Sequence, residues 1–440
     1  MTYDLAIMGG HVVTPEATFA ADIGVRDGKI AAIGTLPRES AGQVMDATGL
    51  HVLPGVIDSQ VHFREPGATY KEDLASGSAA AILGGVTSFF EMPNTMPPTV
   101  SAGALEEKLS LAAGRCHADY AFYVGATAEN AEDLGALESL PGCAGVKLFM
   151  GSSTGTLLVD DEVSLHRIFA SGRRRIAIHA EDEHRLRERK PLALAEKVET
   201  HPEWRDEETA IRATRRALRL ATEHGRPVHI LHVTTGQEMA LLASHNRDIA
   251  SVEVTPQHLT LAAPECYRRL GTLAQMNPPL RDLSHQVAFW QAVRDGIVDV
   301  IGSDHAPHTI EEKSRPYPAS PSGMPGVQTL LPLLLTHYAA GRLSLSRVVT
   351  LTASRPAHLF GLRGKGEIAV GYDADLVLVD LDRAWTIEKD WLRSKCGWSP
   401  FEGWEAIGKP IATLLRGRVV ARDGELVGLA EGKMLEFIVP

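Results

Sequence analysis

The chain has 440 residues, of which 44% are hydrophobic and 22% charged, and its formal net charge at pH 7 is −11. This length suits a barrel domain of roughly 250 to over 300 residues with a smaller domain attached. The negative charge argues against a nucleic-acid-binding surface. The lack of an uncharged apolar stretch of about 18 or more residues argues against a membrane span.

The first residues and the cysteines favour a cytoplasmic protein. The N-terminal segment MTYDLAIMGGHVV carries an acidic residue at position 4 and lacks the basic and apolar regions of a signal peptide. The cysteines are far apart and include no CxxC pair, so we expect reduced thiols. They are Cys116, Cys143, Cys266 and Cys396.

Two similar regions lie near the two ends of the chain. Residues 22–34 and 413–428 each alternate apolar and polar side chains on both sides of an Asp-Gly pair, at positions 27–28 and 423–424. An Asp-Gly pair between alternating strands predicts a β-hairpin, because both turn residues must tolerate positive φ. A further short strand is expected at 374–379. These strands predict one small β domain built from both chain ends.

Eight short apolar or β-branched runs occupy the middle of the chain, and segments with helical spacing, such as 70–83, 207–223 and 283–293, separate most of them. Alternation of strands and helices predicts a parallel sheet, and eight repeats predict closure into a barrel. An open doubly wound sheet is the alternative, but no Gly-rich dinucleotide fingerprint follows the first strand. The runs are Val52–Asp58, Thr87–Met92, Asp119–Val124, Ala144–Phe149, Arg175–His179, Val228–His232, Ala250–Val254 and Val298–Gly302.

These patterns together define the expected domain organisation. The fold class is α/β, with a (β/α)8 TIM-type barrel over residues 51–360. A small β-sandwich-like domain is formed jointly by residues 1–50 and residues 361–440.

Polar side chains stand in or just after five of the expected strands, and in such a barrel the chemistry sits at the carboxyl ends of the strands. A histidine at a strand end is usually a structural polar residue, but three of them at one end of a barrel favour a metal centre. Imidazole and carboxylate donors suit zinc or a similar divalent ion. An acidic residue beside a metal also suits a general acid/base. The candidates are His62, Lys147, His179, His232 and Asp304.

Lys147 interrupts the apolar run Gly145–Met150. An unpaired charged lysine in a dry barrel costs several kcal/mol, with a pKa shift on the order of 3–5 units. Such a lysine is nucleophilic, and carbamylation by CO2 would convert it into a bridging anion. A partly buried lysine paired with a carboxylate is the alternative.

Arg64 lies two residues after His62, and its guanidinium fork suits bidentate binding of a carboxylate. A structural ion pair with Glu65 is the alternative. Three more polar residues follow expected strands, where loop capping and substrate contact are about equally plausible: Asn94, Asn277 and His308. Four histidines are interpreted as structural: His184, His224, His229 and His305.

Taken together, these motifs resemble the amidohydrolase superfamily and, within it, the dihydroorotases. The combination of HFREPG, MPNT, NPPLR and DHAPH is specific, and the resemblance runs in order along nearly the whole chain. The matching blocks are PGVIDSQVHFREPG (54–67), EMPNTMPPT (91–99), GVKLFMGSSTG (145–155), IHAED (178–182), HILHVTTGQE (229–238), EVTPQHL (253–259), QMNPPLR (275–281), GSDHAPH (302–308), SGMPGVQTLLPLLLT (322–336) and 353–379.

The resemblance implies a centre of one or two divalent metals, usually zinc, in a barrel. Lys147 matches the carboxylated bridging lysine of the family, and His179 and His232 match the ligands of the more exposed metal. His62 matches a ligand of the more buried metal. Asp304 matches the residue that both binds metal and transfers the proton.

The resemblance also implies the substrate contacts and the reaction, which interconverts N-carbamoyl-L-aspartate and L-dihydroorotate in pyrimidine biosynthesis. Arg64, Asn94 and His308 match the groups that hold the substrate carboxylate. Asn277 matches a contact to the substrate ring. In hydrolysis, Asp304 is expected to take a proton and deliver it to the departing ring nitrogen.

Two positions depart from the family pattern. The family has His-x-His at the first strand, where this chain has Gln60 before His62. Glutamine offers an amide oxygen, but it is a poorer zinc donor than imidazole, so Gln60 is a doubtful ligand. Gln257 stands where relatives often have histidine. Because the other ligands and the carboxylate clamp remain, we expect an active enzyme with an altered metal site.

Three alternatives to a dihydroorotase stay open. The first is a related cyclic-amide hydrolase, namely a dihydropyrimidinase, hydantoinase or allantoinase. The second, supported by Gln60, is a catalytically silent partner of aspartate transcarbamoylase. The third is a plain barrel with scattered histidines. The family further implies a homodimer and a small-molecule substrate.

Overall fold

The computed structural model describes residues 2–153 and 157–438, and its central element is a barrel of eight parallel strands. Each strand pairs with the next one along the chain, and a parallel bridge between Val61 and His305 joins the last to the first. The expected TIM-type barrel is therefore confirmed. Its strands are β8 (Val56–Val61), β9 (Val86–Glu91), β10 (Asp119–Gly125), β11 (Cys143–Phe149), β12 (Ile176–His179), β13 (Val228–Ile230), β14 (Ala250–Val254) and β15 (Val300–Ile301).

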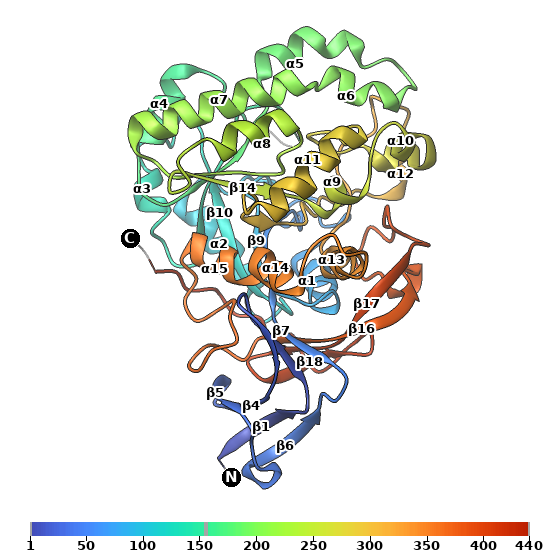
Figure 1. Ribbon diagram of the computed structural model, residues 1–440. Coiled ribbons are helices and arrows are strands. Elements are labelled where there is room, and N and C mark those ends of the chain that lie inside the picture. The colour runs from blue at the N-terminus through green and yellow to red at the C-terminus, as the bar shows by residue number, and fades with distance from the viewer. Residues whose placement is uncertain (1, 154–156, 439–440) are drawn as a thin grey trace.

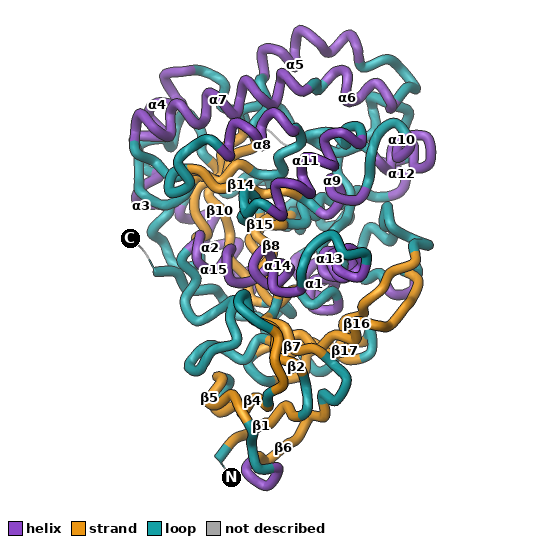
Figure 2. Tube along the Cα trace, in the orientation of Figure 1, coloured by secondary structure: helices purple, strands orange, loops and turns teal. Residues whose placement is uncertain are grey.

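Helices surround these strands, as Figure 2 shows. Helix α7 illustrates why they form: the Asp206 side chain caps its first turn, and Gly225, with φ +62°, ends it. The helices are α1 (Leu74–Leu83), α2 (Ala102–Ala112), α3 (Leu134–Leu137), α4 (Glu162–Ala170), α5 (Glu183–Arg189), α6 (His201–Trp204), α7 (Glu207–His224), α8 (Gly236–Ala243), α9 (Pro256–Thr260), α10 (Glu265–Leu270), α11 (Leu283–Arg294), α12 (Ile310–Lys313), α13 (Leu330–Ala339), α14 (Leu345–Val349) and α15 (Arg355–Phe360).

The two chain ends together build two further sheets, which lie at one end of the molecule in Figure 1. One has the order β5-β4-β1-β6 and the other β19-β18-β17-β16-β7-β2-β3. Apolar side chains such as Ile23, Val52 and Leu376 form one cluster between the sheets, which gives the expected sandwich-like packing. The strands are β1 (Tyr3–Met8), β2 (His11–Val13), β3 (Thr18–Ala20), β4 (Asp22–Arg26), β5 (Lys29–Gly34), β6 (Ala41–Asp46), β7 (His51–Pro54), β16 (Leu376–Thr386), β17 (Glu405–Leu415), β18 (Arg418–Arg422) and β19 (Glu425–Leu426).

The expected run Val52–Asp58 is wrong in one respect, because it contains parts of two strands. Strand β7 belongs to the seven-stranded sheet and β8 to the barrel, with Gly55 between them. The Gly55 N–H donates to the carbonyl of Asp375 (2.8 Å). A Cβ at this position would lie 2.1 Å from Oγ1 of Thr87. Glycine is therefore required where the chain passes from one sheet to the other.

The last residues of the described chain cover the amino ends of the barrel strands. Met434 forms a parallel bridge with Tyr120, and Leu435 is 2% exposed. The ring of Phe437 packs on Phe90, with 5.8 Å between centroids. This end of the barrel is thus filled by apolar side chains.

Among the described residues, none of the helices has the length and apolarity needed to cross a membrane.

Candidate metal and substrate site

Nine of the ten side chains that the sequence singled out line one cavity at the carboxyl ends of the barrel strands. Each comes from a strand or from a loop beyond its carboxyl end, so the barrel unites positions that are far apart in the chain. The nine are Gln60, His62, Arg64, Asn94, Lys147, His179, His232, Asn277 and Asp304. Phe149, Ser153, Ala306, Ser322 and Gly323 complete the lining.

Two imidazoles face each other across this cavity. Nε2 of His179 bonds to a carboxylate oxygen of Glu181 (2.8 Å), so Nε2 carries the proton and Nδ1 presents a lone pair. That Nδ1 lies 3.1 Å from Nε2 of His232. Burial lowers the pKa of both histidines, which keeps the rings neutral, the form in which imidazole binds metal.

His62 and Asp304 form a second pair of potential ligands. Nδ1 of His62 donates to Oδ1 of Asn94 (2.8 Å), so Nε2 presents a lone pair. That Nε2 lies 3.3 Å from a carboxylate oxygen of Asp304. Two electron-rich atoms at this separation repel each other unless a proton or a cation lies between them. Burial lowers the pKa of His62, which disfavours the proton.

Lys147 enters the cavity from β11 and is 1% exposed. Its Nζ lies 4.4 Å from the centre of the Phe149 ring and has no hydrogen-bond partner among the described residues. Burial lowers the pKa of this amine to about 7, despite the opposing charges of Asp304 and Glu253. The ion pair that would have made Lys147 a structural residue is therefore absent from the described part of the chain.

The donor set fits a divalent cation. Within the described residues, Lys147 Nζ, Gln60 Oε1 and His232 Nδ1 are buried without a hydrogen-bond partner. A shared cation satisfies both facing nitrogens, as it does the lone pair of His62 opposite Asp304.

The amide nitrogen and the amide oxygen of Gln60 have different surroundings. Its Nε2 donates to Oδ1 of Asp304 (3.0 Å), while its Oε1 lacks a hydrogen-bond partner among the described residues. The second departure, Gln257, is buried beside the cavity and donates to the carbonyl of Ser303 (2.7 Å). Both glutamines therefore act as hydrogen-bond donors next to Asp304.

Arg64 is a buried cation that lines the cavity without an ion pair among the described residues. The side chain is 5% exposed, and its Nε donates to the carbonyl of Pro307 (3.2 Å). Glu65, the alternative partner, instead pairs with Arg115 (2.8 Å). Burial lowers the pKa of Arg64 to about 10, so the guanidinium stays charged at neutral pH. A buried cation of this kind requires an anion.

His308 lies behind Arg64 and is not part of the cavity lining. Its Nε2 donates to the carbonyl of Ser322 (3.0 Å), and its Nδ1 accepts from Nζ of Lys71 (3.0 Å). Nε2 also lies 3.4 Å from the guanidinium of Arg64. Both ring nitrogens are thus occupied by other partners, so the ring lies beside the guanidinium without accepting a hydrogen bond from it.

Asn277 lines the cavity with its amide oxygen fixed by the protein. Nε2 of His201 donates to this oxygen (3.0 Å) and to the carbonyl of Met276 (3.1 Å). The oxygen is therefore engaged, which leaves the NH2 group as the part of Asn277 suited to a ligand's carbonyl.

Three residues of the site have backbone conformations that are strained for side chains other than glycine. The φ angles are +64° for Arg64, +35° for His232 and +43° for Asp304. Such conformations cost on the order of 1–3 kcal/mol each and persist where the surroundings enforce them. Their presence together at one cavity is typical of a functional site.

Sequence reasoning missed the residues that support the ligands. Burial alone would raise the pKa of Glu181, but Arg205 and the bond to His179 outweigh it and lower it to about 2. The Arg205 Nε lies 3.0 Å from the Glu181 carboxylate. The spacing of His179 and Glu181, two residues apart, was a usable signal, because such residues share one face of an extended strand. Nothing local indicated Arg205.

Comparison with known proteins identifies the family. The family model described as the amidohydrolase family matches residues 51–420. The dihydroorotase of Halobacterium salinarum is 40% identical over 87% of this chain and 89% of its own length. The allantoinase of Deinococcus radiodurans is 34% identical over 99% of both chains. The solved L-hydantoinase (dihydropyrimidinase) of Arthrobacter aurescens superposes with a TM-score of 0.93 at 30% identity, covering 98% of this chain and 99% of that chain. The motif resemblance is confirmed, and the chain belongs to the amidohydrolase family.

Proposed function

We propose that the protein is a zinc-dependent dihydroorotase, which interconverts N-carbamoyl-L-aspartate and L-dihydroorotate. The observation that carries this proposal is the environment of Arg64, a buried guanidinium lining the cavity with no carboxylate partner among the described residues. L-dihydroorotate brings a ring carboxylate that matches this guanidinium. The dihydroorotase relatives support the same substrate.

Allantoinases and hydantoinases are the competing candidates, because an allantoinase and a hydantoinase are also similar over almost the whole chain. Simple hydantoins and dihydropyrimidines carry no ring carboxylate. With such a substrate the charge of Arg64 would stay buried and unpaired, at a cost of several kcal/mol. This cost favours dihydroorotate over the neutral rings.

The ligands proposed for zinc are His62, His179, His232, Asp304 and Lys147 in its carboxylated form. A divalent ion at this position supplies Lewis-acid polarisation of the amide carbonyl and a water that ionises near neutral pH. Lys147 suits carboxylation because its buried amine lacks a hydrogen-bond partner within the described chain. Carboxylation would convert the buried, unpaired amine of Lys147 into a carbamate anion, which would bind zinc together with the neutral imidazoles.

The chain's own residues would orient the substrate and move the proton. Arg64 binds the ring carboxylate, and the NH2 group of Asn277 faces the ring carbonyls. Asp304 accepts a proton on its carboxylate and passes it to the ring nitrogen as the amide bond breaks. Gln60 donates to Oδ1 of Asp304 (3.0 Å), which leaves Oδ2 as the oxygen for this transfer.

The test is hydrolysis of L-dihydroorotate, dihydrouracil, hydantoin and allantoin by zinc-loaded protein, with zinc content measured on the same sample. We expect turnover of dihydroorotate in preference to the three others. Preferred turnover of a neutral ring would replace the proposal by that cyclic-amide hydrolase. No turnover, no bound zinc and association with aspartate transcarbamoylase would replace it by the silent partner.

A further inference from the structure

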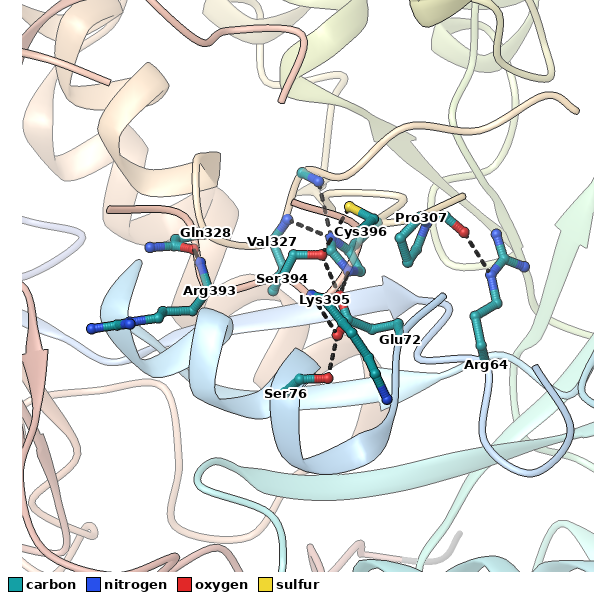
Figure 3. Close-up of polar contacts among 12 residues, drawn as sticks. Arg64, Glu72, Ser76, Pro307, Val327, Gln328, Arg393, Ser394, Lys395 and Cys396 are labelled. Atoms are coloured by element: carbon teal, nitrogen blue, oxygen red, sulfur yellow. Dashed lines mark hydrogen bonds and ion pairs between the residues drawn. The ribbon is translucent and has the colours of Figure 1, made fainter. Parts of the chain in front are cut away.

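Glu72 is a fully buried carboxylate outside the proposed chemistry. It lies in the loop between β8 and α1, one residue before the helix cap Asp73. Figure 3 shows several donors converging on it. They are the Ser76 hydroxyl, the Ser394 hydroxyl, the Lys395 backbone N–H (3.1 Å) and Nε2 of His305 (3.3 Å). A buried charge of this kind is tolerated only because so many donors satisfy it.

The ring of His305 is fixed in one tautomer by its neighbours. Nδ1 accepts from the backbone N–H of Gly326 (3.0 Å) and of Val327 (3.3 Å). Nδ1 is therefore unprotonated, and the proton sits on Nε2, where it is directed at Glu72. Each nitrogen of this ring has a partner, so His305 links Glu72 rigidly to the segment around Val327.

The backbone of His305 is connected to two of the proposed zinc ligands: a hydrogen bond joins it to His62, and Asp304 is the preceding residue in the chain. Its carbonyl accepts from the N–H of His62 (2.8 Å), and its own N–H donates to the Ser303 hydroxyl (3.0 Å). Asp304 lies between these anchors with φ +43°. A strained conformation of this kind persists only where the surrounding contacts enforce it.

The outer part of this network comes from the C-terminal third of the chain. Ser394 and Lys395 belong to the connection between β16 and β17. In the same connection, the indole N–H of Trp398 donates to the carbonyl of His308 (2.8 Å). The side-chain amide of Gln328 donates to the carbonyl of Trp391 (2.6 Å). The connection thus fastens the loops after the first and last barrel strands to each other.

We propose that Glu72 is a positioning residue, which holds His62 and Asp304 in place through His305, and that Ser394 completes its hydrogen bonds. The proposal rests on the proposed function for the zinc site and for the identity of the substrate. Partners of metal ligands typically contribute roughly 10- to 100-fold to metal affinity or activity. Misplacement of a reacting group by about 1 Å has an effect of similar size.

The first test compares Glu72→Gln with Glu138→Gln. Glu138 is also a buried carboxylate, and it accepts from the N–H of Arg174 (2.9 Å) and pairs with Arg226, but it lies before β11 at the other end of the barrel. Zinc retention is measured by competition with a chelator, and kcat and KM with L-dihydroorotate. We expect Glu72→Gln to lose zinc affinity and kcat by roughly 10- to 100-fold, with KM changed less than about threefold. Glu138→Gln should lower thermal stability alone.

The second test uses Ser394, which guards against a Glu72 variant that does not fold. Ser394→Ala removes one hydroxyl and should lower zinc retention and kcat in the same direction, while Ser394→Thr should restore both. If both Ser394→Ala and Glu72→Gln kept wild-type zinc retention and kcat, the proposal would be overturned. The hydrogen bonds around Glu72 would then have a structural role only. Absence of dihydroorotate turnover in wild-type protein that retains zinc would reject the proposed substrate, whereas chelator competition would still decide on Glu72.

Discussion

Arg64 is held at the cavity by a neutral group, the carbonyl of Pro307, so its charge is available to a ligand. Hydrogen bonds between charged groups contribute about 1.5–3 kcal/mol. Replacement of Arg64 by Met should therefore raise KM for L-dihydroorotate roughly 10- to 100-fold. Zinc content should not change, because the guanidinium is outside the proposed ligand set.

Dihydrouracil provides the control for this variant, because it has the same ring without the carboxylate. Any turnover of dihydrouracil by wild-type protein should be equally fast or faster in Arg64→Met. Steady-state kinetics with both substrates measures the difference. An unchanged KM for dihydroorotate would remove Arg64 from the carboxylate site.

Gln60 replaces the first histidine of the family motif and presents a donor to Asp304. Its amide oxygen is neutral and a poorer zinc donor than imidazole. We expect the wild type to retain roughly one zinc ion per chain after dialysis, whereas Gln60→His should retain more, because imidazole is a better donor. Elemental analysis of the dialysed proteins measures this.

The other glutamine that departs from the family provides the matched control. Gln257 is buried next to Ser303 but does not line the cavity. Gln257→His should leave the zinc content at the wild-type value. Two tightly bound ions in the wild type would contradict this account of Gln60.

The sequence predicted the residues at the cavity better than their roles. His62, His179, His232 and Asp304 were found because they follow buried strands whose carboxyl ends meet. The place of His308 was not foreseen, since whether a loop side chain faces a cavity or a neighbour depends on distant contacts such as that with Lys71. The same holds for His305, which the sequence suggested was merely structural and which the structure ties to Glu72.

Among the elements, α7 depends on the residue that precedes it, Asp206, for more than a cap. Asp206 accepts from the N–H and hydroxyl of Thr209 and pairs with Arg185. Burial would raise the pKa of Asp206, but these partners outweigh it and lower the pKa to about 2. Asp206→Ala should lower the free energy of unfolding by roughly 1–2 kcal/mol, as loss of a helix cap does. Urea denaturation at neutral pH measures this.

The pH dependence of this contribution follows from the direction of the shift. Because the pKa of Asp206 is lower in the folded than in the unfolded state, its stabilisation is present above about pH 4 and disappears as the pH falls toward 2. Wild type and Asp206→Ala should therefore converge in stability over this range. Asp206→Asn keeps a capping group and should lose less. A difference that stays constant down to pH 2 would contradict the assignment.

Elements with a strong local pattern were predictable. The helix expected at 207–223 is observed at Glu207–His224, and that expected at 283–293 at Leu283–Arg294. The break at Gly55 was not predictable, because the run around it is continuously apolar and only contacts with Asp375 and Thr87 divide it.

At the scale of the whole molecule, the joining of the chain ends was predictable and their further contacts were not. The Asp-Gly hairpins at both ends predicted a shared β domain, and β16 does pair with β7. The connection between β16 and β17 and the segment at 432–438 carry no regular pattern, so their attachment to the two ends of the barrel appears only in the folded chain.

The segment at 432–438 leads to the last prediction. Leu435 is 2% exposed, its N–H donates to the carbonyl of Tyr120 (2.9 Å), and its side chain belongs to the apolar cluster that includes Phe90. Leu435→Ala should lower the free energy of unfolding by roughly 2–5 kcal/mol, as truncation of a buried leucine does. Zinc retention and KM should stay at wild-type values, because this cluster fills the barrel end opposite the cavity.

Leu429, 83% exposed, is the matched control a few residues earlier in the chain, and Leu429→Ala should change neither stability nor activity. Denaturation midpoints and zinc retention are measured on all three proteins. If Leu435→Ala lost zinc in proportion to its loss of stability, the two ends of the barrel would be energetically coupled. Loss of stability with zinc retention intact would show that the apolar end of the barrel stabilises the fold, whereas the loops at the other end hold the site. This division of roles is typical of TIM-type barrels.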